Sequence, residues 1–235
     1  MDKISNRQLP IMVIIVLGIM TTFGPLTIDM YVPSLPNVQH DFSTSVSQAQ
    51  LTLSFAMIGL AIGQFIFGPL SDAYGRKKVA LFIISIYALA SLLAVFTASM
   101  GVLLTLRLVQ GLTGGGAIVI AKATMGDQHE GKALAKGLAA LLVINGIITI
   151  IAPIIGGYAL TISNWKAIFV ILAIVSVIIL FLSIRHLEET HQPNRAKLNF
   201  KVIFKDFAHL LKTPAFIIPM ILQGLTYIML FSFSS

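Results

Sequence analysis

The sequence predicts an all-α protein that crosses a membrane several times. Three observations support this prediction: 57% of the 235 residues are hydrophobic, only 11% are charged, and the mean hydropathy is +0.92. A soluble domain has about 25% charged residues, so most of this chain is expected to lie in lipid. Helices are expected because they satisfy their own backbone polar groups inside a bilayer.

Seven apolar runs approach the length of a membrane span, and none shows the two-residue alternation of a membrane barrel. The first run follows two basic residues, as a secretory signal would, but it exceeds the roughly 7 to 15 apolar residues of such a signal. We therefore expect it to be an uncleaved span. The predicted spans cover residues 9–31, 46–71, 79–98, 102–121, 134–160, 165–187 and 215–233.

The positions of the basic residues predict the orientation of these spans. All but two of the 16 Lys and Arg residues lie at the N-terminus or in alternate connections, the exceptions being Lys166 and Arg107. Because basic loops stay in the cytoplasm, the N-terminus is predicted to be cytoplasmic and the membrane to be a cell (inner) membrane. The net charge of +7 is then a topology signal, and no nucleic-acid partner is expected.

Polar segments divide the chain into three predicted parts. Residues 1–187 form a six-helix transmembrane domain, 188–212 a cytoplasmic linker, and 213–235 a seventh transmembrane helix that starts a truncated C-terminal domain. Secondary transporters are commonly built from three-helix repeats nested in six-helix halves, and this order of spans fits that plan. Within the linker, residues 200–211 place apolar side chains at helical spacing among lysines, which fits a helix on the inner leaflet or a cap on the bundle.

Two ionisable residues interrupt the apolar runs. A charge at lipid depth is costly unless it is paired or hydrated, so both residues are functional candidates. Asp29 is expected to be a proton or substrate site, or else an interfacial residue satisfied by water and by the turn that Pro33 and Pro36 would force. Arg107 lies midway along the fourth run, where it cannot easily snorkel. It should face the bundle interior, either for function or to bond the backbone carbonyls of neighbouring helices.

Glycine and proline interrupt corresponding helices of the two predicted repeats. Matched interruptions point to a central substrate site, but small residues also allow helices to pack closely, and both interpretations stay open. The residues expected to bend helices or line a cavity are Gly24, Pro25, Gly111, Gly114 and Gly115, with Gly116 beside them.

The sequence lacks the residues that several other kinds of site need. It contains no Cys, and its five His residues form no metal-ligand cluster on one helical face, so no metal is expected. Gly111 and Gly116 share the outer spacing of a phosphate-binding loop, but Ala117 and Ile118 stand where Lys and Ser or Thr are needed. No Ser, His and Asp grouping suggests hydrolysis. Neither an enzyme nor a cofactor is expected.

A short polar loop joins the second and third predicted spans. Gly75 permits a tight turn in this loop, and Asp72 and Arg76 can form a charge-assisted contact. Such a contact would latch helix ends in one state and part in the other. The alternative is a solvated basic loop that only obeys the positive-inside rule.

Several motifs together resemble one transporter family. The loop GPLSDAYGRKK at 68–78 is similar to the signature between helices two and three of the major facilitator superfamily. Four further motifs resemble the drug-proton antiporters of that family related to the bicyclomycin and chloramphenicol exporters. These motifs are TIDMYVPSLP at 27–36, QLTLS at 50–54, RLVQG at 107–111 and APIIGG at 152–157.

This resemblance implies roles for further residues. Ala73 stands where the family usually has Arg, and no second acid precedes Asp29 in the first span, so Asp29 would have to serve alone. The implied gating-loop residues are Gly68, Asp72, Gly75, Arg76, Lys77 and Asp127, and the implied helix-bending residues also include Pro153, Gly156 and Gly157.

The function implied by the resemblance is proton-coupled export of a small molecule by alternating access. Asp29 would take a proton when the cavity closes, and a cationic or amphipathic substrate would compete for its charged form. Arg107 would bias Asp29 or its waters towards the ionised state. The expected partners are thus substrate, protons and membrane lipid. The alternative is a fragment that transports nothing, or a binding or assembly partner, because one six-helix domain cannot enclose a path between two halves.

Overall fold

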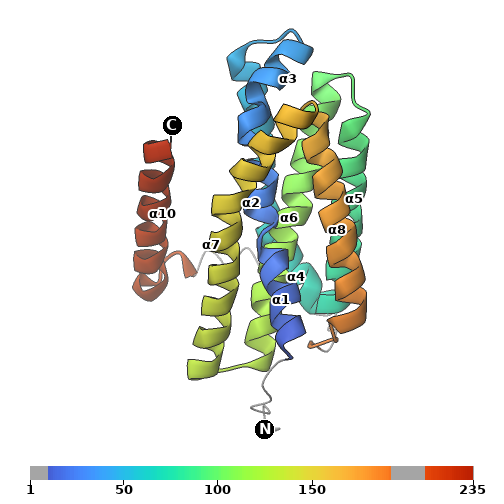
Figure 1. Cartoon of the computed structure of the whole chain (residues 1–235). Coiled ribbons are helices and arrows are strands. Elements are labelled where there is room, and N and C mark those ends of the chain that lie inside the picture. Colours follow the sequence, from blue (N-terminus) through green and yellow to red (C-terminus); the bar gives the residue numbers. More distant parts are fainter. Residues whose placement is uncertain (1–9, 192–209, 235) are drawn as a thin grey trace. The chain divides into compact units, whose positions relative to one another are not determined.

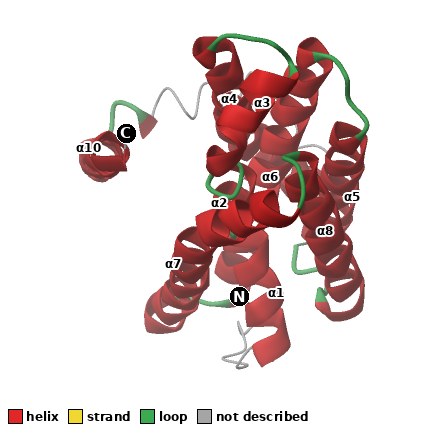
Figure 2. Cartoon of the chain, turned by 45° about the horizontal axis from the view of Figure 1, so that its top comes forward, coloured by secondary structure: helices red, strands yellow, loops and turns green. Residues whose placement is uncertain are grey.

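The computed structural model describes residues 10–191 and 210–234, and over these residues it contains helices and loops but no strand (Figures 1 and 2). This confirms the predicted all-α fold. The helices are α1 (Ile11–Thr21), α2 (Phe23–Ile28), the 3-10 helix η1 (Val32–Ser34), α3 (Leu35–Asp41), α4 (Val46–Tyr74), α5 (Arg76–Val95), α6 (Met100–Gln128), α7 (Gly131–Ile162), α8 (Lys166–His186) and α10 (Pro214–Ser234).

The chain divides into two compact units, residues 1–195 and 196–235. The first unit contains α1 to α8, and α10 is the described helix of the second. Most of the predicted linker lies outside the described residues, as does its amphipathic stretch up to residue 209. The predicted division at 187 and 212 therefore stays a prediction.

Six helical segments in the first unit are long and apolar enough to cross a membrane, in agreement with the six spans predicted for it. The helices extend beyond the predicted spans at their polar ends. For example, α5 begins at Arg76 rather than 79, and α6 continues to Gln128 rather than 121. The reason is that hydropathy detects only the part of a helix at lipid depth, whereas the backbone hydrogen bonds continue past it.

The first span is a chain of short helices rather than one long helix. It runs from Ile11 to Asp41 and so continues ten residues past its predicted end at 31. A turn does follow α2, at residues 29–31, but Pro33 and Pro36 come after it and each occupies the first turn of a helix, η1 or α3. Proline is tolerated there because the first backbone N–H groups of a helix have no partner within it.

Close backbone contact joins α4 to α6. A Cβ atom added at Gly59 or Gly63 of α4 would collide with backbone atoms of α6, and one at Gly111 or Gly115 would collide with backbone atoms of α4. Small residues bring membrane helices together in this way. The contact fixes α6, and with it Arg107, against α4.

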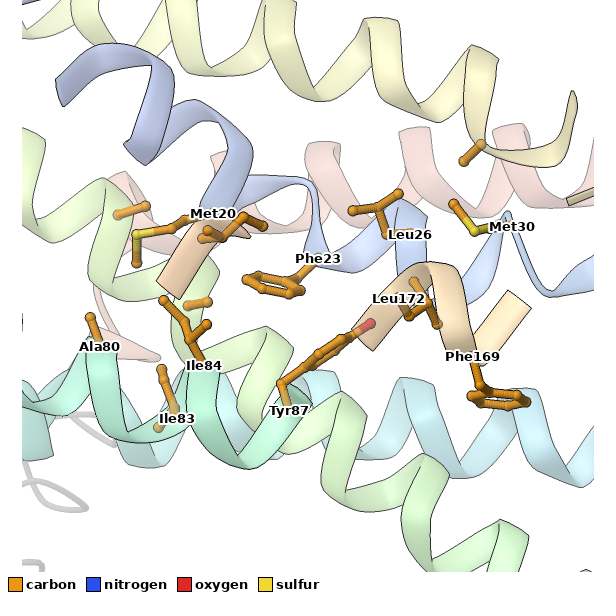
Figure 3. Packing of buried hydrophobic residues seen from close by; sticks show 14 of the residues in the cluster. Met20, Phe23, Leu26, Met30, Ala80, Ile83, Ile84, Tyr87, Phe169 and Leu172 are labelled. Carbon is orange, nitrogen blue, oxygen red and sulfur yellow. The ribbon is translucent and has the colours of Figure 1, made fainter. Parts of the chain in front are cut away.

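A buried apolar cluster holds the first span against α5 and α8. Figure 3 shows Phe23 of the first span directed towards Ile84 and Tyr87 of α5, and its ring centroid lies 4.4 Å from that of Tyr87. Elsewhere large apolar side chains are exposed on the bundle surface, as at Phe96, which is 74% exposed. A soluble domain rarely exposes so much contiguous apolar surface, and this distribution is that of a multi-pass membrane protein.

Candidate functional site

Arg107 lies on α6 in the interior of the bundle and is fully buried. Its three guanidinium nitrogens all donate hydrogen bonds: Nη2 to the Thr27 carbonyl at 2.6 Å, Nη1 to Gln110 Oε1 at 3.1 Å and Nε to the Thr52 carbonyl at 3.4 Å. The ring of Tyr31 lies 4.2 Å from its Cζ atom. Among the described residues no carboxylate pairs with Arg107, so neutral dipoles and an aromatic face stabilise its charge.

The Thr27 carbonyl is available to Arg107 because the first span changes its hydrogen-bonding pattern at this point. In a regular helix the N–H of Tyr31 would donate to Thr27, but here it donates to Ile28 at 3.1 Å. The N–H of Met30 reaches back to Pro25 at 3.3 Å. The hydrogen bonds of the span therefore change from the regular four-residue spacing to spacings of three and five residues. This leaves the Thr27 carbonyl without its helical partner, and Arg107 donates to it instead.

A chain of polar side chains extends from Arg107 to α5 and returns to the first span. Gln110 Nε2 donates to Ser91 Oγ at 2.8 Å, and Ser91 donates to the Tyr87 carbonyl. The Tyr87 hydroxyl shares a 2.7 Å hydrogen bond with Thr27 Oγ1. All these groups are buried. Buried polar groups of this kind fix a unique arrangement of helices because each has its partner.

Asp29 follows two residues after Thr27, directly beyond the end of α2, and its side chain is partly exposed. Within the described part of the chain its carboxylate forms neither an ion pair nor a side-chain hydrogen bond. The structure therefore does not join Asp29 to Arg107 directly. Arg107 instead bonds the carbonyl of Thr27, two residues before Asp29, so both residues belong to the same irregular turn.

Pro25 creates a second irregularity in the first span. It has no N–H, so the carbonyl of Thr21 loses its usual helical partner. Asn145 of α7 supplies the missing donor, with Nδ2 at 2.7 Å from that carbonyl. The span divides at Thr22, between α1 and α2, which is two residues before Gly24 and three before Pro25. The sequence analysis missed Asn145.

The glycines of α6 do not interrupt that helix, which is continuous from Met100 to Gln128. Gly111 and Gly115 contact α4, whereas a Cβ atom added at Gly114 would lie at ordinary contact distance from Phe23 and Tyr87. These positions favour close packing, one of the two open interpretations. Bending of α6 in another conformation stays a prediction.

The proline and glycines expected to bend the fifth span lie in α7, which is likewise continuous through Pro153. A Cβ atom at Gly156 would meet the Met30 carbonyl, so this glycine lets α7 approach the irregular turn beside Asp29. Gly157 faces open space. Gly156 thus lies against the site, and bending of α7 at Pro153 and Gly157 in another conformation stays a prediction.

An ion-pair cluster around the buried Arg76 lies where the ends of α4, α5 and α6 meet, and we call Asp72, Arg76 and Asp127 the Arg76 cluster. Arg76 Nη2 lies 2.5 Å from Asp72 Oδ1, and Arg76 Nε lies 2.9 Å from Asp127 Oδ2. Nη1 also donates to Ser71 Oγ at 2.6 Å. The structure thus brings together the three charged residues that the sequence analysis had grouped.

The start of the segment after α8 closes over this cluster. Glu189 Oε1 accepts a 2.6 Å hydrogen bond from the backbone N–H of Arg76, and Thr190 Oγ1 donates to Asp127 at 3.1 Å. Gly75 has φ +99° and lies so close to Glu189 that a Cβ atom would collide with the carboxylate. Lys77 donates to the Ile184 carbonyl rather than to an acid. Sequence reasoning missed Glu189 because nothing local marks a pairing over more than a hundred residues.

A pocket of about 220 Å³ lies at the opposite end of the bundle, beside α3. The residues lining it are Pro36, Asn37, His40, Asp41, Asn164 and Trp165. Among the described residues no group of three or more His, Cys, Asp or Glu side chains could hold a metal ion. The candidate site is the irregular turn of the first span with Asp29 and Arg107. It lies between the Arg76 cluster at one end of the bundle and the pocket beside α3 at the other.

Comparison with known proteins agrees with this architecture. The family model described as Major Facilitator Superfamily matches residues 15–235. An uncharacterized MFS-type transporter, YdgK of Bacillus subtilis, is 38% identical over 176 residues, which is 74% of this chain and 44% of the relative. A bicyclomycin resistance protein homolog of Haemophilus influenzae is 33% identical over 85% of this chain and 50% of the relative.

The multidrug resistance protein MdtL of a Shewanella species is 32% identical over 71% of this chain and 42% of its own length. The chain thus spans about half the length of the curated relatives it matches. A crystal structure of the human organic anion transporter MFSD10 superposes with a TM-score of 0.61 at 18% identity, over 80% of this chain and 50% of that one. At this identity the superposition supports the fold alone.

Proposed function

Since the chain belongs to the major facilitator superfamily, we propose that its six-helix unit works in a proton-coupled exporter of small molecules that operates by alternating access. The family consists of membrane transporters, in agreement with the prediction that the chain is not an enzyme. The observation that carries the proposal is Asp29. Among the described residues its carboxylate has no ion-pair partner, and it lies at the irregular turn of a membrane span, two residues after the carbonyl that the fully buried Arg107 bonds.

The chemistry of this turn supports a coupling site. An isolated carboxylate at membrane depth can be neutralised by a proton or by a cationic substrate, and these two ligands then exclude each other. Arg107 is held by neutral acceptors, so its charge is not cancelled locally and acts on its surroundings. Competition at Asp29 would make proton entry favour substrate release.

The bundle also has two kinds of surface. On α8 the exposed residues from Val170 to Ile184 are apolar, which suits lipid. On α4 and α7, which both pack against the first span, many exposed side chains are apolar as well, but exposed polar side chains also occur. These include Ser54, Gln64 and Thr149. These three side chains donate to carbonyls of their own helices, so they can border either water or a substrate. We propose that the α4 and α7 side lines the transport path.

The Arg76 cluster would act as the gate at the predicted cytoplasmic end. Its ion pairs link α5 to both α4 and α6. A charge cluster of this kind is stable in one arrangement of helix ends and must part when these ends separate. The latch function and the cytoplasmic placement rest on the positive-inside rule and on the family.

The relatives suggest the class of substrate. Two of them are named for bicyclomycin resistance and multidrug resistance, so we propose drug-like amphipathic or cationic molecules, exported from the cell across its inner membrane. The positive charge would find its counter-ion in Asp29, the acid of the irregular turn.

Transport in everted membrane vesicles tests the proposal, with the product of the gene that encodes this chain. Drug accumulation driven by an imposed pH gradient is expected to be abolished by Asp29→Asn and retained by Glu130→Gln, a control at an exposed carboxylate just before α7. Proton-coupled transport by Asp29→Asn at the wild-type rate would refute the coupling role. Binding of drug without transport by the wild-type product would favour the alternative of a binding or assembly partner.

A further inference from the structure

Trp165 is the only tryptophan of the chain and is 1% exposed, between the end of α7 and the start of α8. Its indole Nε1 donates a 2.6 Å hydrogen bond to Oδ2 of Asp41, the last residue of α3. The ring of Phe42, next in the chain, lies 5.6 Å from the indole. Asp41 itself is exposed and lines the pocket beside α3. An exposed acid thus holds a buried ring.

A row of aromatic rings leads from this hydrogen bond to the buried guanidinium. Trp165 meets Phe169 edge to face with ring centroids 5.8 Å apart, and Phe169 meets Tyr31 in the same way at 5.6 Å. Tyr31 lies 4.2 Å and Phe169 5.8 Å from Cζ of Arg107. Trp165 and Phe169 lie at the start of α8, Tyr31 lies in the first span and Arg107 lies in α6. The row of rings therefore connects these three elements.

From this arrangement we infer that Asp41 is a positioning residue for Arg107, acting through Trp165, Phe169 and Tyr31. The indole hydrogen bond fixes the rotation of the Trp165 ring, because turning the ring would move Nε1 away from the carboxylate. Close-packed rings cannot shift independently, so the orientation of Trp165 limits those of Phe169 and Tyr31.

The consequence for Arg107 follows from its remaining partners. Its hydrogen bonds go to uncharged acceptors, so the electron-rich face of Tyr31 is a substantial part of what stabilises its charge. If Asp41 releases Trp165, the Tyr31 face no longer has a fixed position over the guanidinium. The relevance of this link to transport rests on the proposed function, whereas the packing itself does not.

A simpler role for the Asp41–Trp165 hydrogen bond would be to tie α3 to the bundle with no effect on Arg107. The two roles differ in their effect on the proton chemical shift of the Arg107 Nε–H group, because the ring current of Tyr31 contributes to that shift. A proton near an aromatic face resonates at a position that depends on its distance and angle to that ring, so a small displacement of Tyr31 shifts the signal.

The experiment uses the 235-residue chain with ¹⁵N-labelled arginine in detergent micelles. Arg107→Lys identifies the Nε–H signal of Arg107 by its disappearance, and Tyr31→Leu gives the position of that signal without the ring. We expect Asp41→Ala to move the signal by at least a third of the distance to the Tyr31→Leu position. Asp41→Asn should restore the wild-type position, since an amide oxygen also accepts the indole N–H.

Two further variants keep the test decisive. Trp165→Phe keeps a ring but removes the N–H, and it should move the Arg107 signal in the same direction as Asp41→Ala, even if the latter does not fold. Asp72→Ala, in the Arg76 cluster, should leave the signal unchanged. A wild-type signal in both Asp41→Ala and Trp165→Phe would overturn the inference, as would an equal shift in Asp41→Asn and Asp41→Ala. None of these results depends on transport activity.

Discussion

Asn145 of α7 donates its side-chain N–H to the backbone carbonyl of Thr21 at 2.7 Å. Pro25 leaves this carbonyl without the partner that a continuous helix would give it. A side chain of one membrane span therefore supplies the hydrogen bond that is missing in another. This hydrogen bond links α7 to the break between α1 and α2 in the first span.

This relationship predicts a specific coupling between residues 145 and 25. Asn145→Ala is expected to lower the free energy of unfolding by about 1 kcal/mol, because it leaves a backbone carbonyl unpaired. In a Pro25→Ala background the same substitution should cost much less, because the restored amide can reach Thr21. Reversible unfolding in mixed micelles measures the double-mutant cycle. Equal costs in both backgrounds would show that Asn145 acts through some other contact.

Arg107 is predicted to be intolerant even of lysine. A single ammonium group cannot span three acceptors from different helices, and it lacks the planar face that packs on Tyr31. We expect Arg107→Lys to destabilise the bundle by about 2 to 4 kcal/mol, the range for breaking a buried polar network. Thermal unfolding in detergent checks this, with the exposed Arg185→Lys as the matched control. Similar midpoints for both variants would contradict the structure.

The two ion pairs of Arg76 should differ in strength. The Asp127 side chain is 19% exposed and that of Asp72 is 42% exposed, so water screens the second pair more. We predict a coupling energy of about 1 to 3 kcal/mol between Arg76 and Asp127 and of about 0.5 kcal/mol between Arg76 and Asp72. Double-mutant cycles with Ala and Asn substitutions measure both. A larger coupling energy for Arg76 and Asp72 than for Arg76 and Asp127 would contradict this prediction.

Glycine substitutions should separate packing from bending. Gly63→Ala would push a methyl group into the backbone of α6, and we expect a loss of about 2 kcal/mol or more. Gly126→Ala is the control, since nothing lies within 4 Å of its added Cβ atom. This second change should be neutral or stabilising by up to about 1 kcal/mol, because alanine favours a helix. Chemical unfolding measures the free energy of unfolding of both variants, and an equal change in the two would contradict the close packing at Gly63.

Much of the fold was predictable because the thickness of a bilayer sets the length of each span. The membrane segments of α4 to α8 lie where the apolar runs placed them. The grouping of Asp72, Arg76 and Asp127 was also predictable, since two of them are four residues apart on facing helix ends and the third came from a family motif.

The residues that sequence reasoning missed form pairs far apart in the chain. Glu189 bonds the backbone of Arg76, and Trp165 bonds Asp41, with no local pattern that joins the partners. Asn145 could have been found: a proline inside an apolar run implies an unpaired carbonyl four residues earlier, and Asn145 is a conspicuous polar exception in the fifth run. The course of the first span beyond Tyr31 was missed because prolines were read as a turn rather than as helix starts.

The burial of the sole indole gives the protein an intrinsic optical reporter. Trp165 lies at the α3 end of the bundle and is shielded from solvent, so its emission tracks the opening of that end without any added dye. The chain also has no Cys, and a thiol introduced near the Arg76 cluster could carry an energy acceptor at one known place. Light alone could then follow both ends of the bundle while a proton gradient is imposed.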